Sequence, residues 1–433
     1  MSPSAVPASG TLTLDARIKY MHRIYVSCMC YAIGEMFFTG TFMLLYLARL
    51  GVPGERILFY LALPIFISIF TLVPFAQWTE RLGKIFTGVV GLSLATAAMV
   101  ILIVDGFLPS QFTEPLILFS MCLYGFGYGM YVDSWYPMLT TIVPEERRGR
   151  FFGNNRVTYQ TAIILVTFIF TWLLAKDSSL FMFQCCFVFI VLMRIVGIVL
   201  YAGIPDLDRR LPTAGLWATL AAAIRTPGYL AFSAYIFLLS LFTGACPSIF
   251  GLLAKETLKM SADQVMLIGN LTTIGMVGGF FLAGRLVDRV GTRYVFMFCH
   301  FSFALVLISF LFRDFIPLPR LIFIGTPALL FGVIQAGSSV AVSSEMLAVL
   351  PVDNKVMGTA VNMALMFFGV SFSGIFSSQM LKTGMLSYSW KFCGAAMGPY
   401  DSLLLICSVM ILILVVTLGL VPSVLRVATV QLK

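Results

Sequence analysis

The sequence has 433 residues, of which 60% are hydrophobic and 11% are charged, and its formal net charge is +9. Soluble domains carry about 25% charged residues, so this composition excludes a chain whose surface is mostly exposed to water. The positive charge does not indicate a nucleic-acid-binding protein, because the Lys and Arg residues lie between apolar segments and act as topology signals.

Twelve apolar segments are each long enough to cross a bilayer as a helix, which takes about 20 residues. They are preceded by a polar N-terminal tail, residues 1–23, in which no cleavable signal peptide is recognised. The chain is therefore predicted to be an all-α membrane protein with twelve transmembrane helices. The predicted spans are residues 24–49, 57–77, 85–105, 116–143, 151–175, 179–203, 228–252, 265–284, 294–312, 321–350, 358–381 and 403–423.

The charges of the loops predict how these spans are oriented. With the N-terminus in the cytoplasm, 17 of the 28 Lys and Arg residues fall in cytoplasmic segments and 9 in external ones. Because cytoplasmic loops carry the excess of positive charge, both termini are expected inside, in a multi-pass protein of the plasma membrane, or of the inner membrane if the cell is bacterial. The longest cytoplasmic loop, residues 204–227, is predicted to link two six-helix bundles, residues 24–203 and 228–423, with a C-terminal tail over 424–433.

The two predicted bundles repeat one sequence pattern. An acid-Arg-x-Gly loop follows the second span and again the eighth, and Gly83 corresponds to Gly291 with an offset of 208. A second loop, after the fourth and the tenth spans, aligns Pro144 with Pro351 with an offset of 207. Two landmarks with nearly one offset predict two pseudo-symmetric halves, which is one plan of alternating-access transporters.

These loops resemble those of the major facilitator superfamily over essentially the whole chain. The resemblance implies that the acid of each signature loop faces a helix N-terminus in the opposite half and that the loop arginines form cytoplasmic ion pairs, together latching the outward-open state. The alternative is that they are only topology charges. Glu80 stands where the family usually has Asp, and the expected first Gly is missing there. The predicted gating residues are Glu80, Arg81, Gly83, Arg147, Arg150, Asp288, Arg289, Gly291 and Arg293.

Ionisable residues inside the spans are the first candidates for a functional site, because each costs several kcal/mol unless it is paired or faces water. Glu35 lies in the middle of the first span, and Tyr31 and Thr39 share its helical face. Asp133 lies in the fourth span, on a face that also carries two glycines at positions 125 and 129. The resemblance implies that spans one, four, seven and ten line a central cavity, although either acid could instead be a buried structural carboxylate.

The densest polar cluster within a span lies at the start of the fifth. Arg156 is predicted to lie at nearly the depth of Asp133, so an ion pair between them would lower the cost of burying either charge. This cluster is the first candidate for a substrate site, with Asn154, Asn155, Tyr159 and Gln160 as further members.

The second half offers milder, neutral polar groups. Gln335 and Ser339 lie in the tenth span and Asn362 in the eleventh, and they suit hydrogen bonding to a neutral solute. Arg194 and His300 lie in spans six and nine, which the resemblance places at the periphery, so both are expected to be structural.

A partial similarity connects the chain with the melibiose-type sugar–cation symporters of this family. Asp133, Trp135, Arg156 and Glu35 are comparable to an Asp, Trp, Arg and acid of that branch. Two departures are the short spacing between Asp133 and Trp135 and the absence of an acid in the second span, where the branch builds its sodium site. The coupling ion is therefore predicted to be a proton, since burial disfavours the charged form of a carboxylate.

The sequence thus predicts a secondary transporter that moves a small polar solute, such as a sugar or glycoside, through the bilayer as a monomer. The alternatives are an exporter of amphipathic compounds, and a receptor or assembly protein on the same scaffold. An enzyme is not expected, since neither H-E-x-x-H nor G-x-S-x-G occurs. No metal site is expected, because the nine cysteines show no metal-site or disulfide spacing in a polar context. No cofactor and no nucleic-acid partner are expected either.

Overall fold

The computed structural model describes residues 14–419 with the exception of 109, 144–147, 177–178, 207–224, 226–227, 316–318, 350–354 and 387–388. Eleven helices in it are long and apolar enough to cross a membrane, and α1 with α2, a pair bent by 43°, makes a twelfth span. The predicted all-α architecture with twelve spans is confirmed. Much of the predicted linker over 204–227 lies outside the described residues.

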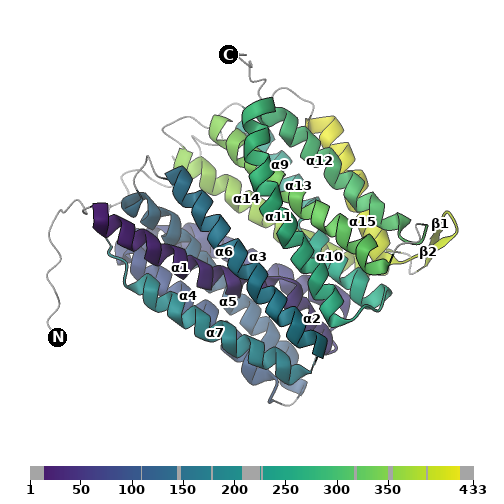
Figure 1. Cartoon of the computed structure of the whole chain (residues 1–433), viewed down its shortest axis with the longest axis horizontal. Helices are drawn as coiled ribbons and strands as arrows, with labels where there is room; N and C mark the ends of the chain where they lie inside the picture. Colours follow the sequence, from purple (N-terminus) through teal and green to yellow (C-terminus); the bar gives the residue numbers. More distant parts are fainter. Residues whose placement is uncertain are drawn as a thin grey trace.

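The N-terminal half packs its helices side by side as one bundle (Figure 1). Helices α3, α4, α5 and α6 are longer than their predicted spans, whereas α7 is two residues shorter than its span of 179–203. The helices are α1 (Leu14–Thr39), α2 (Thr41–Arg49), α3 (Gly54–Leu82), α4 (Lys84–Asp105), α5 (Thr113–Ile142), α6 (Arg148–Lys176) and α7 (Leu180–Ala202).

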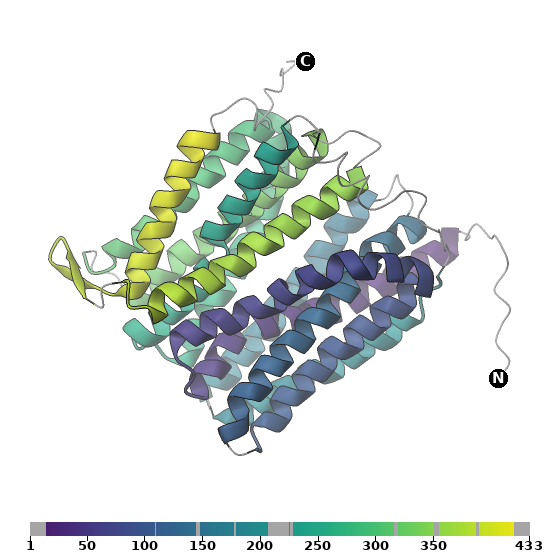
Figure 2. The ribbon, with the colours of Figure 1, turned by 180° about the vertical axis from the view of Figure 1, so that it is seen from behind.

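The C-terminal half forms a second bundle beside the first (Figure 2). Its helices are α9 (Tyr229–Thr243), α10 (Cys246–Leu252), α11 (Ala262–Val290), α12 (Thr292–Ser309), α13 (Arg320–Val349), α14 (Lys355–Lys382) and α15 (Pro399–Leu414). A π-helical turn, Leu253–Thr257, follows α10, and another, Val415–Gly419, follows α15.

Helix α1 begins within the segment predicted to be a tail. Its first turns are polar, and two arginines there reach backbone carbonyls at the ends of neighbouring helices. Arg17 donates to the carbonyl of Ile142 (3.4 Å) and Arg23 to that of Gly203 (2.6 Å). These contacts give the polar segment hydrogen-bonding partners and let the helix continue ten residues beyond the predicted span.

The predicted repeat is present in the backbone. Gly83 ends α3 and begins α4 with φ 106° and ψ 143°, and Gly291 joins α11 to α12 with φ 88° and ψ 155°. Such positive φ values favour glycine, because a Cβ would clash with the backbone. The two halves therefore make the same sharp turn at corresponding loops.

The first spans of both halves are also broken at corresponding places. Span one bends at Gly40, where a side chain would press on the carbonyl of Met36. Span seven is interrupted before Cys246 and Pro247, and Pro247 corresponds to Gly40 when the offset of 207 is applied. Proline has no N–H with which to continue the hydrogen-bonding ladder. At the break, the N–H of Ala245 donates to Ser373 Oγ of α14 (2.9 Å).

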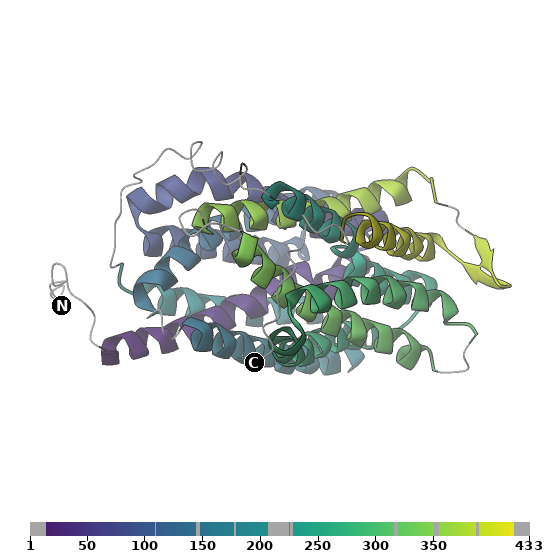
Figure 3. The ribbon, with the colours of Figure 1, turned by 90° about the horizontal axis from the view of Figure 1, so that it is seen from above.

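A short antiparallel hairpin, β1 (Trp390–Phe392) and β2 (Ala395–Met397), lies in the loop before α15 and was not predicted. It projects sideways from the C-terminal half (Figure 3). We call the end of the helix bundle that carries this hairpin the hairpin end, and the opposite end, where α1 begins, the tail end. The halves contact each other through α3 with α14, α6 with α11, and α2 with α10 and α11.

Candidate substrate and coupling site

Glu35 is the charged residue at the centre of the candidate site. It lies in α1 between the tail end and the bend at Gly40, and its side chain is half-buried. Its carboxylate lies near the hydroxyl groups of Tyr128 and Tyr31 and near the positive charge of Arg194. The Tyr31 hydroxyl is buried and has no hydrogen-bond partner among the described residues. Thr39, predicted to share the site, donates its hydroxyl to the backbone carbonyl of Glu35 (2.9 Å) instead.

Arg194 of α7 points into the N-terminal bundle and is only 2% exposed. Its Nε donates to Thr96 Oγ1 (3.0 Å), and its guanidinium lies over the rings of Tyr31 (5.3 Å) and Tyr124 (5.6 Å). Its two Nη atoms have no hydrogen-bond partner among the described residues, and no direct ion pair with Glu35 is formed. The arginine is thus a buried, incompletely paired cation that faces the carboxylate at longer range.

Gly34 makes room for this arginine. A Cβ at position 34 would lie 2.6 Å from Arg194 Cδ, so even alanine would displace the side chain. The presence of glycine at position 34, next to Glu35, is therefore explained by its packing against Arg194. A small residue beside an acid and a lone arginine in an apolar span are the only sequence signals of this contact, and neither shows which way the arginine points.

Tyrosine rings form a wall beside Glu35. Tyr31 packs on Tyr131 with ring centroids 4.2 Å apart and on Tyr128 at 6.3 Å. Tyr124 lies 6.4 Å from Tyr128 and nearly parallel to it. Tyr128 is half-buried and meets Phe367 of α14 at 6.3 Å, so this wall extends from the coupling residue to the other half.

Asp133 lies on a different face of α5. Gly125 and Gly129 share its face and contact the backbone of α3 at Pro64 and Ser68, which confirms that these glycines admit a neighbouring helix. The Oδ2 atom of Asp133 is buried and has no hydrogen-bond partner among the described residues. The nearby Trp135 is half-buried and packs against the core.

The predicted ion pair between Asp133 and Arg156 does not form. Arg156 is exposed, and its guanidinium lies over the ring of Phe280 of α11, 4.8 Å from the centroid. Equal depth along two neighbouring spans would not fix the direction in which each helix presents a side chain. The face of α5 that carries Gly125 and Gly129 packs on α3, whereas Arg156 reaches across to the C-terminal half.

The polar residues around Arg156 also separate. Asn155 is buried and donates to Cys28 Sγ (3.3 Å), while its Oδ1 has no partner among the described residues. Asn154 is exposed, Gln160 is buried and Tyr159 is half-buried against the core. Asn155 therefore points toward α1, whereas Asn154 and Arg156 are exposed, so the cluster predicted from sequence is distributed around α6.

The C-terminal half buries neutral groups at its centre. His300 hydrogen-bonds to Tyr235 (2.8 Å) and to Ser338 (2.7 Å), linking α12 to α9 and α13. Asn362 donates to Ser233 Oγ (3.3 Å). Gln335 and Ser339, both predicted to contact the solute, are half-buried, and the Ser339 carbonyl accepts from Ser343.

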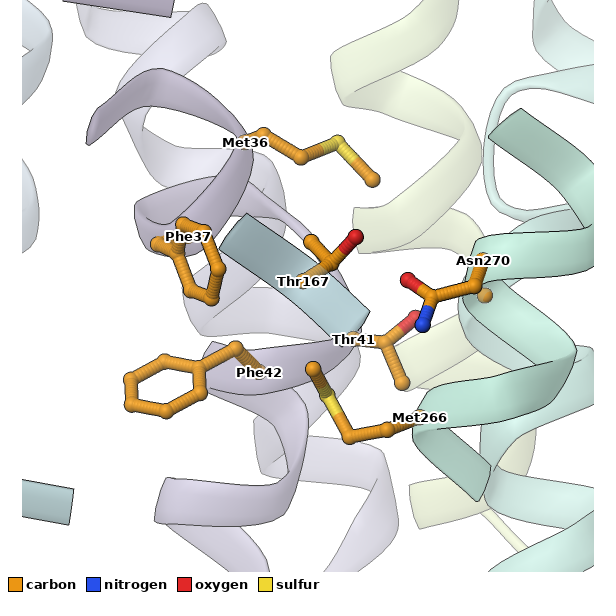
Figure 4. A pocket seen from close by; sticks show the side chains of 8 residues that line it. Met36, Phe37, Thr41, Phe42, Thr167, Met266 and Asn270 are labelled. Atoms are coloured by element: carbon orange, nitrogen blue, oxygen red, sulfur yellow. The ribbon is translucent and has the colours of Figure 1, made fainter. Parts of the chain in front are cut away.

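A small pocket joins the two halves on the hairpin side of Glu35 (Figure 4). Asn270 of α11 faces Thr41 and Thr167 across it, and its Nδ2 donates to Thr171 Oγ1 of α6 (3.0 Å). Met36 and Met266 add flexible apolar walls. The pocket thus combines few polar groups with side chains that can repack.

For most residues of the predicted gating loops the structure describes the backbone but not the side chain. Gly83 and Gly291 make the turns given above, Arg289 is exposed and Arg293 is half-buried. Arg147 and the side chains of Glu80, Arg81, Arg150 and Asp288 lie outside the described residues. In the part of the chain that the structure describes, no group of three or more His, Cys, Asp or Glu residues is placed to hold a metal ion.

Two six-helix halves, related by a repeat and enclosing buried polar groups near their interface, define a membrane carrier of the alternating-access type. The sequence model of the Major Facilitator Superfamily matches residues 24–374, so the chain belongs to this superfamily. It is a multi-pass membrane protein and a secondary transporter.

Solved structures share this fold at low sequence identity. A mutant form of the nucleoside transporter NupG is 10% identical with a TM-score of 0.71, covering 92% of this chain and 97% of its own. A D-xylose–proton symporter is 15% identical with a TM-score of 0.69, covering 91% and 97%. The xylose transporter XylE from E. coli, in a partially occluded inward-open conformation, is 13% identical with a TM-score of 0.68, covering 92% and 97%. No curated protein matches this sequence.

Proposed function

We propose that this protein is a proton-coupled transporter of a small polar solute, such as a sugar or glycoside, and that Glu35 carries the coupling proton. One observation supports the proposal above the others: Glu35 lies in mid-span among tyrosine hydroxyls and faces the buried Arg194. A charge inside the bilayer is costly unless it is compensated. Gain or loss of one proton at Glu35 therefore changes the electrostatic balance of the whole N-terminal half.

The proposed coupling uses the two charges alternately. Arginine side chains are not deprotonated in proteins, so Glu35 is the partner proposed to gain and lose the proton. Ionised Glu35 balances Arg194, whereas protonated Glu35 leaves the cation uncompensated and makes the carboxyl group a hydrogen-bond donor. Since Tyr128 touches both Glu35 and Phe367 of α14, a shift at the carboxyl group can reach the interface between the halves.

The proposed solute site lies between the halves near Glu35. The polar groups proposed there are neutral apart from Glu35 and the two charges of the predicted cluster, which suits hydroxyl-bearing compounds. Two structurally similar proteins are named as carriers of D-xylose and nucleosides, and these names agree with a polar solute. The residues proposed to contact solute or proton are Tyr31, Glu35, Thr39, Asp133, Trp135, Asn155, Arg156, Tyr159, Gln160, Gln335, Ser339 and Asn362.

In the proposed orientation both termini are cytoplasmic and the hairpin end faces outside, in the plasma membrane or the inner membrane of a bacterium. The excess of Lys and Arg at the tail end supports this orientation. We further propose that the carrier acts as a monomer and needs no cofactor besides its coupling ion. It has no proposed enzymatic activity.

The test is proton movement in proteoliposomes that contain a pH-sensitive dye, to which pools of solutes are added, sugars first. Wild type is compared with Glu35→Gln and with Glu114→Gln, a matched control whose acid is exposed and pairs with Arg56 at the hairpin end. Solute-dependent proton flux that is lost only in Glu35→Gln supports the proposal. Equal flux in Glu35→Gln and wild type would remove Glu35 from the coupling mechanism.

A second candidate function is export of amphipathic compounds. The observation in its favour is a row of phenylalanine rings at the junction of α3, α9 and α14, where Phe368 stacks on Phe66 (6.4 Å) and on Phe237 (5.7 Å). Aromatic surfaces of this kind suit flat, apolar ligands. Dye extrusion from the same proteoliposomes, together with no response to any sugar, would favour the exporter.

A further inference from the structure

At the hairpin end, a glutamate and a tyrosine of the C-terminal half contact the first turn of α3 in the N-terminal half. Tyr400, the second residue of α15, donates its hydroxyl to the carboxylate of Glu256, which lies in the π-helical turn after α10. Both side chains press on Gly54, the first residue of α3 in the N-terminal half. A Cβ at Gly54 would lie 2.8 and 2.9 Å from the two oxygens of Glu256, and closer still to the Tyr400 hydroxyl.

A carboxylate beside a helix N-terminus is favourable, and here it acts against the like charge of Glu55 in the same first turn of α3. The N-terminus of a helix carries about half a positive charge and several backbone N–H groups without an intrahelical partner. Glu256 places its carboxylate at this position of α3, although the two belong to different halves. A residue larger than glycine at position 54 would keep the carboxylate away from the helix terminus.

The C-terminal half holds both side chains rigidly. Asp401, next to Tyr400, forms an ion pair with the buried Arg313, with Nη2 donating to Oδ2 (3.0 Å), and accepts the N–H of Gly398 (2.8 Å). The turn that presents Glu256 is closed by the bond from the Met260 N–H to the Ala254 carbonyl (3.0 Å). The start of α15 and the end of span seven therefore form a fixed support.

The contact lies where the two halves are already close. A Cβ on Gly251 of α10 would lie 2.9 Å from the side chain of Leu44 in α2, and one on Gly374 of α14 would lie 2.7 Å from Ala62 in α3. In an alternating-access cycle, the halves must separate here for this end to open. Every contact that joins the halves at the hairpin end then biases the equilibrium between the two states.

We infer that Glu256 and Tyr400 form a latch that binds the N-terminus of α3 and holds the hairpin end closed until the halves move apart. The inference rests on the alternating-access cycle of the superfamily and not on the identity of the solute or the coupling ion. It assigns a role to three residues outside the loop motifs of the tail end: Gly54, Glu256 and Tyr400.

The test is hydrogen–deuterium exchange of the full chain in lipid nanodiscs, read by mass spectrometry. Glu256→Gln and Tyr400→Phe are compared with wild type and with Glu114→Gln, whose ion pair with Arg56 lies at the same end but within one half. A hydrogen bond to a charged group accounts for about a tenfold change in an equilibrium. We therefore expect about tenfold faster exchange in peptides covering residues 41–60 and 246–260 for the two latch variants, and no change for Glu114→Gln.

A steric variant gives a second, independent measurement. Gly54→Ala adds a methyl group against Glu256 and Tyr400, whereas Gly278→Ala adds one in α11 where no atom lies within 4 Å. Faster exchange at the hairpin end in Gly54→Ala, but not in Gly278→Ala, is expected. Adding Glu256→Gln to Gly54→Ala should give little further change, because both break one contact.

Exchange rates in Glu256→Gln, Tyr400→Phe and Gly54→Ala equal to those of wild type would overturn the latch. Faster exchange throughout the molecule, rather than at the hairpin end, would also overturn it, since that result describes a general loss of stability. Neither readout needs a solute or a proton gradient. Failure of the latch can therefore be told apart from failure of the proposed proton coupling.

Discussion

The two halves of this transporter share a backbone plan but bury different chemistry. Both turn at a positive-φ glycine, Gly83 or Gly291, and both have a broken first span. The N-terminal half holds the half-buried Glu35 and the buried Arg194, whereas the C-terminal half centres on the uncharged contacts of His300. A repeated scaffold thus fixes where helices bend without fixing which side chains fill the core.

This difference has an energetic consequence. A group that gains or loses charge in low dielectric changes the stability of its surroundings much more than a neutral hydrogen-bonded group does. In the described part of the C-terminal half, the buried ion pair is Arg313 with Asp401, which lies at the hairpin end rather than in the core. The N-terminal core is therefore expected to respond to protons, and the C-terminal half to supply a stable counterpart and the closing contacts.

The largest expected loss of stability comes from breaking the ion pair of the C-terminal half. Asp401→Asn removes the buried counter-charge of Arg313 and leaves only the exposed carboxylate of Asp314, 3.8 Å from Arg313 Nε, at a cost of about 3 kcal/mol. Thermal unfolding in detergent should show a clearly lowered midpoint. The number of protons moved per solute should stay that of wild type, and a changed ratio would contradict the division of roles between the halves.

Arg194→Gln is expected to destabilise the N-terminal half somewhat less, by about 2 kcal/mol, because Glu35 can take up a proton once its counter-charge is removed. The double variant with Glu35→Gln should recover part of this loss, since neither charge is then left alone. The unfolding midpoints of wild type, the two single variants and the double variant form a mutant cycle. Strict additivity in that cycle would show that the two residues do not interact.

Some of this arrangement could be predicted from the sequence and some could not. The spans and the paired glycine turns follow from local patterns, namely hydrophobic length and a loop motif that occurs twice. Arg194 was placed at the periphery because its span is peripheral, yet a helix at the edge of a bundle still has one face turned inward. Which residues pair across helices depends on helix rotation, and a single sequence does not contain that information.

Variants at the two glycine turns show whether these corresponding loops contribute equally to the stability of the protein. Gly83→Ala and Gly291→Ala each place a Cβ in a backbone region that is almost restricted to glycine, at a cost of about 1–3 kcal/mol. Equal losses in the two variants are expected, measured by thermal unfolding of each purified protein. A large loss in one variant only would show that the two loops have diverged in structural importance.

The smallest expected effect is in the neutral network of the C-terminal half. Ser338→Ala removes one of the two hydrogen bonds of His300 and leaves the bond to Tyr235. Hydrogen bonds between membrane helices are worth about 0.6 kcal/mol on average and at most about 1.7 kcal/mol. A shift in unfolding midpoint as large as that of Arg194→Gln would mean that losing a neutral hydrogen bond in the C-terminal core costs as much stability as losing a charge in the N-terminal core.

The hairpin before α15 carries a cysteine that can be labelled chemically to determine how the protein is oriented in the membrane. Cys393 lies at its tip with an exposed side chain and φ 47°, while the other cysteines are buried, half-buried or, like Cys185, within a membrane span. A maleimide that cannot cross a bilayer would reach this thiol first. Applied to intact cells, such a reagent would show directly which compartment the overhanging loop occupies, and from it the side on which every other loop lies.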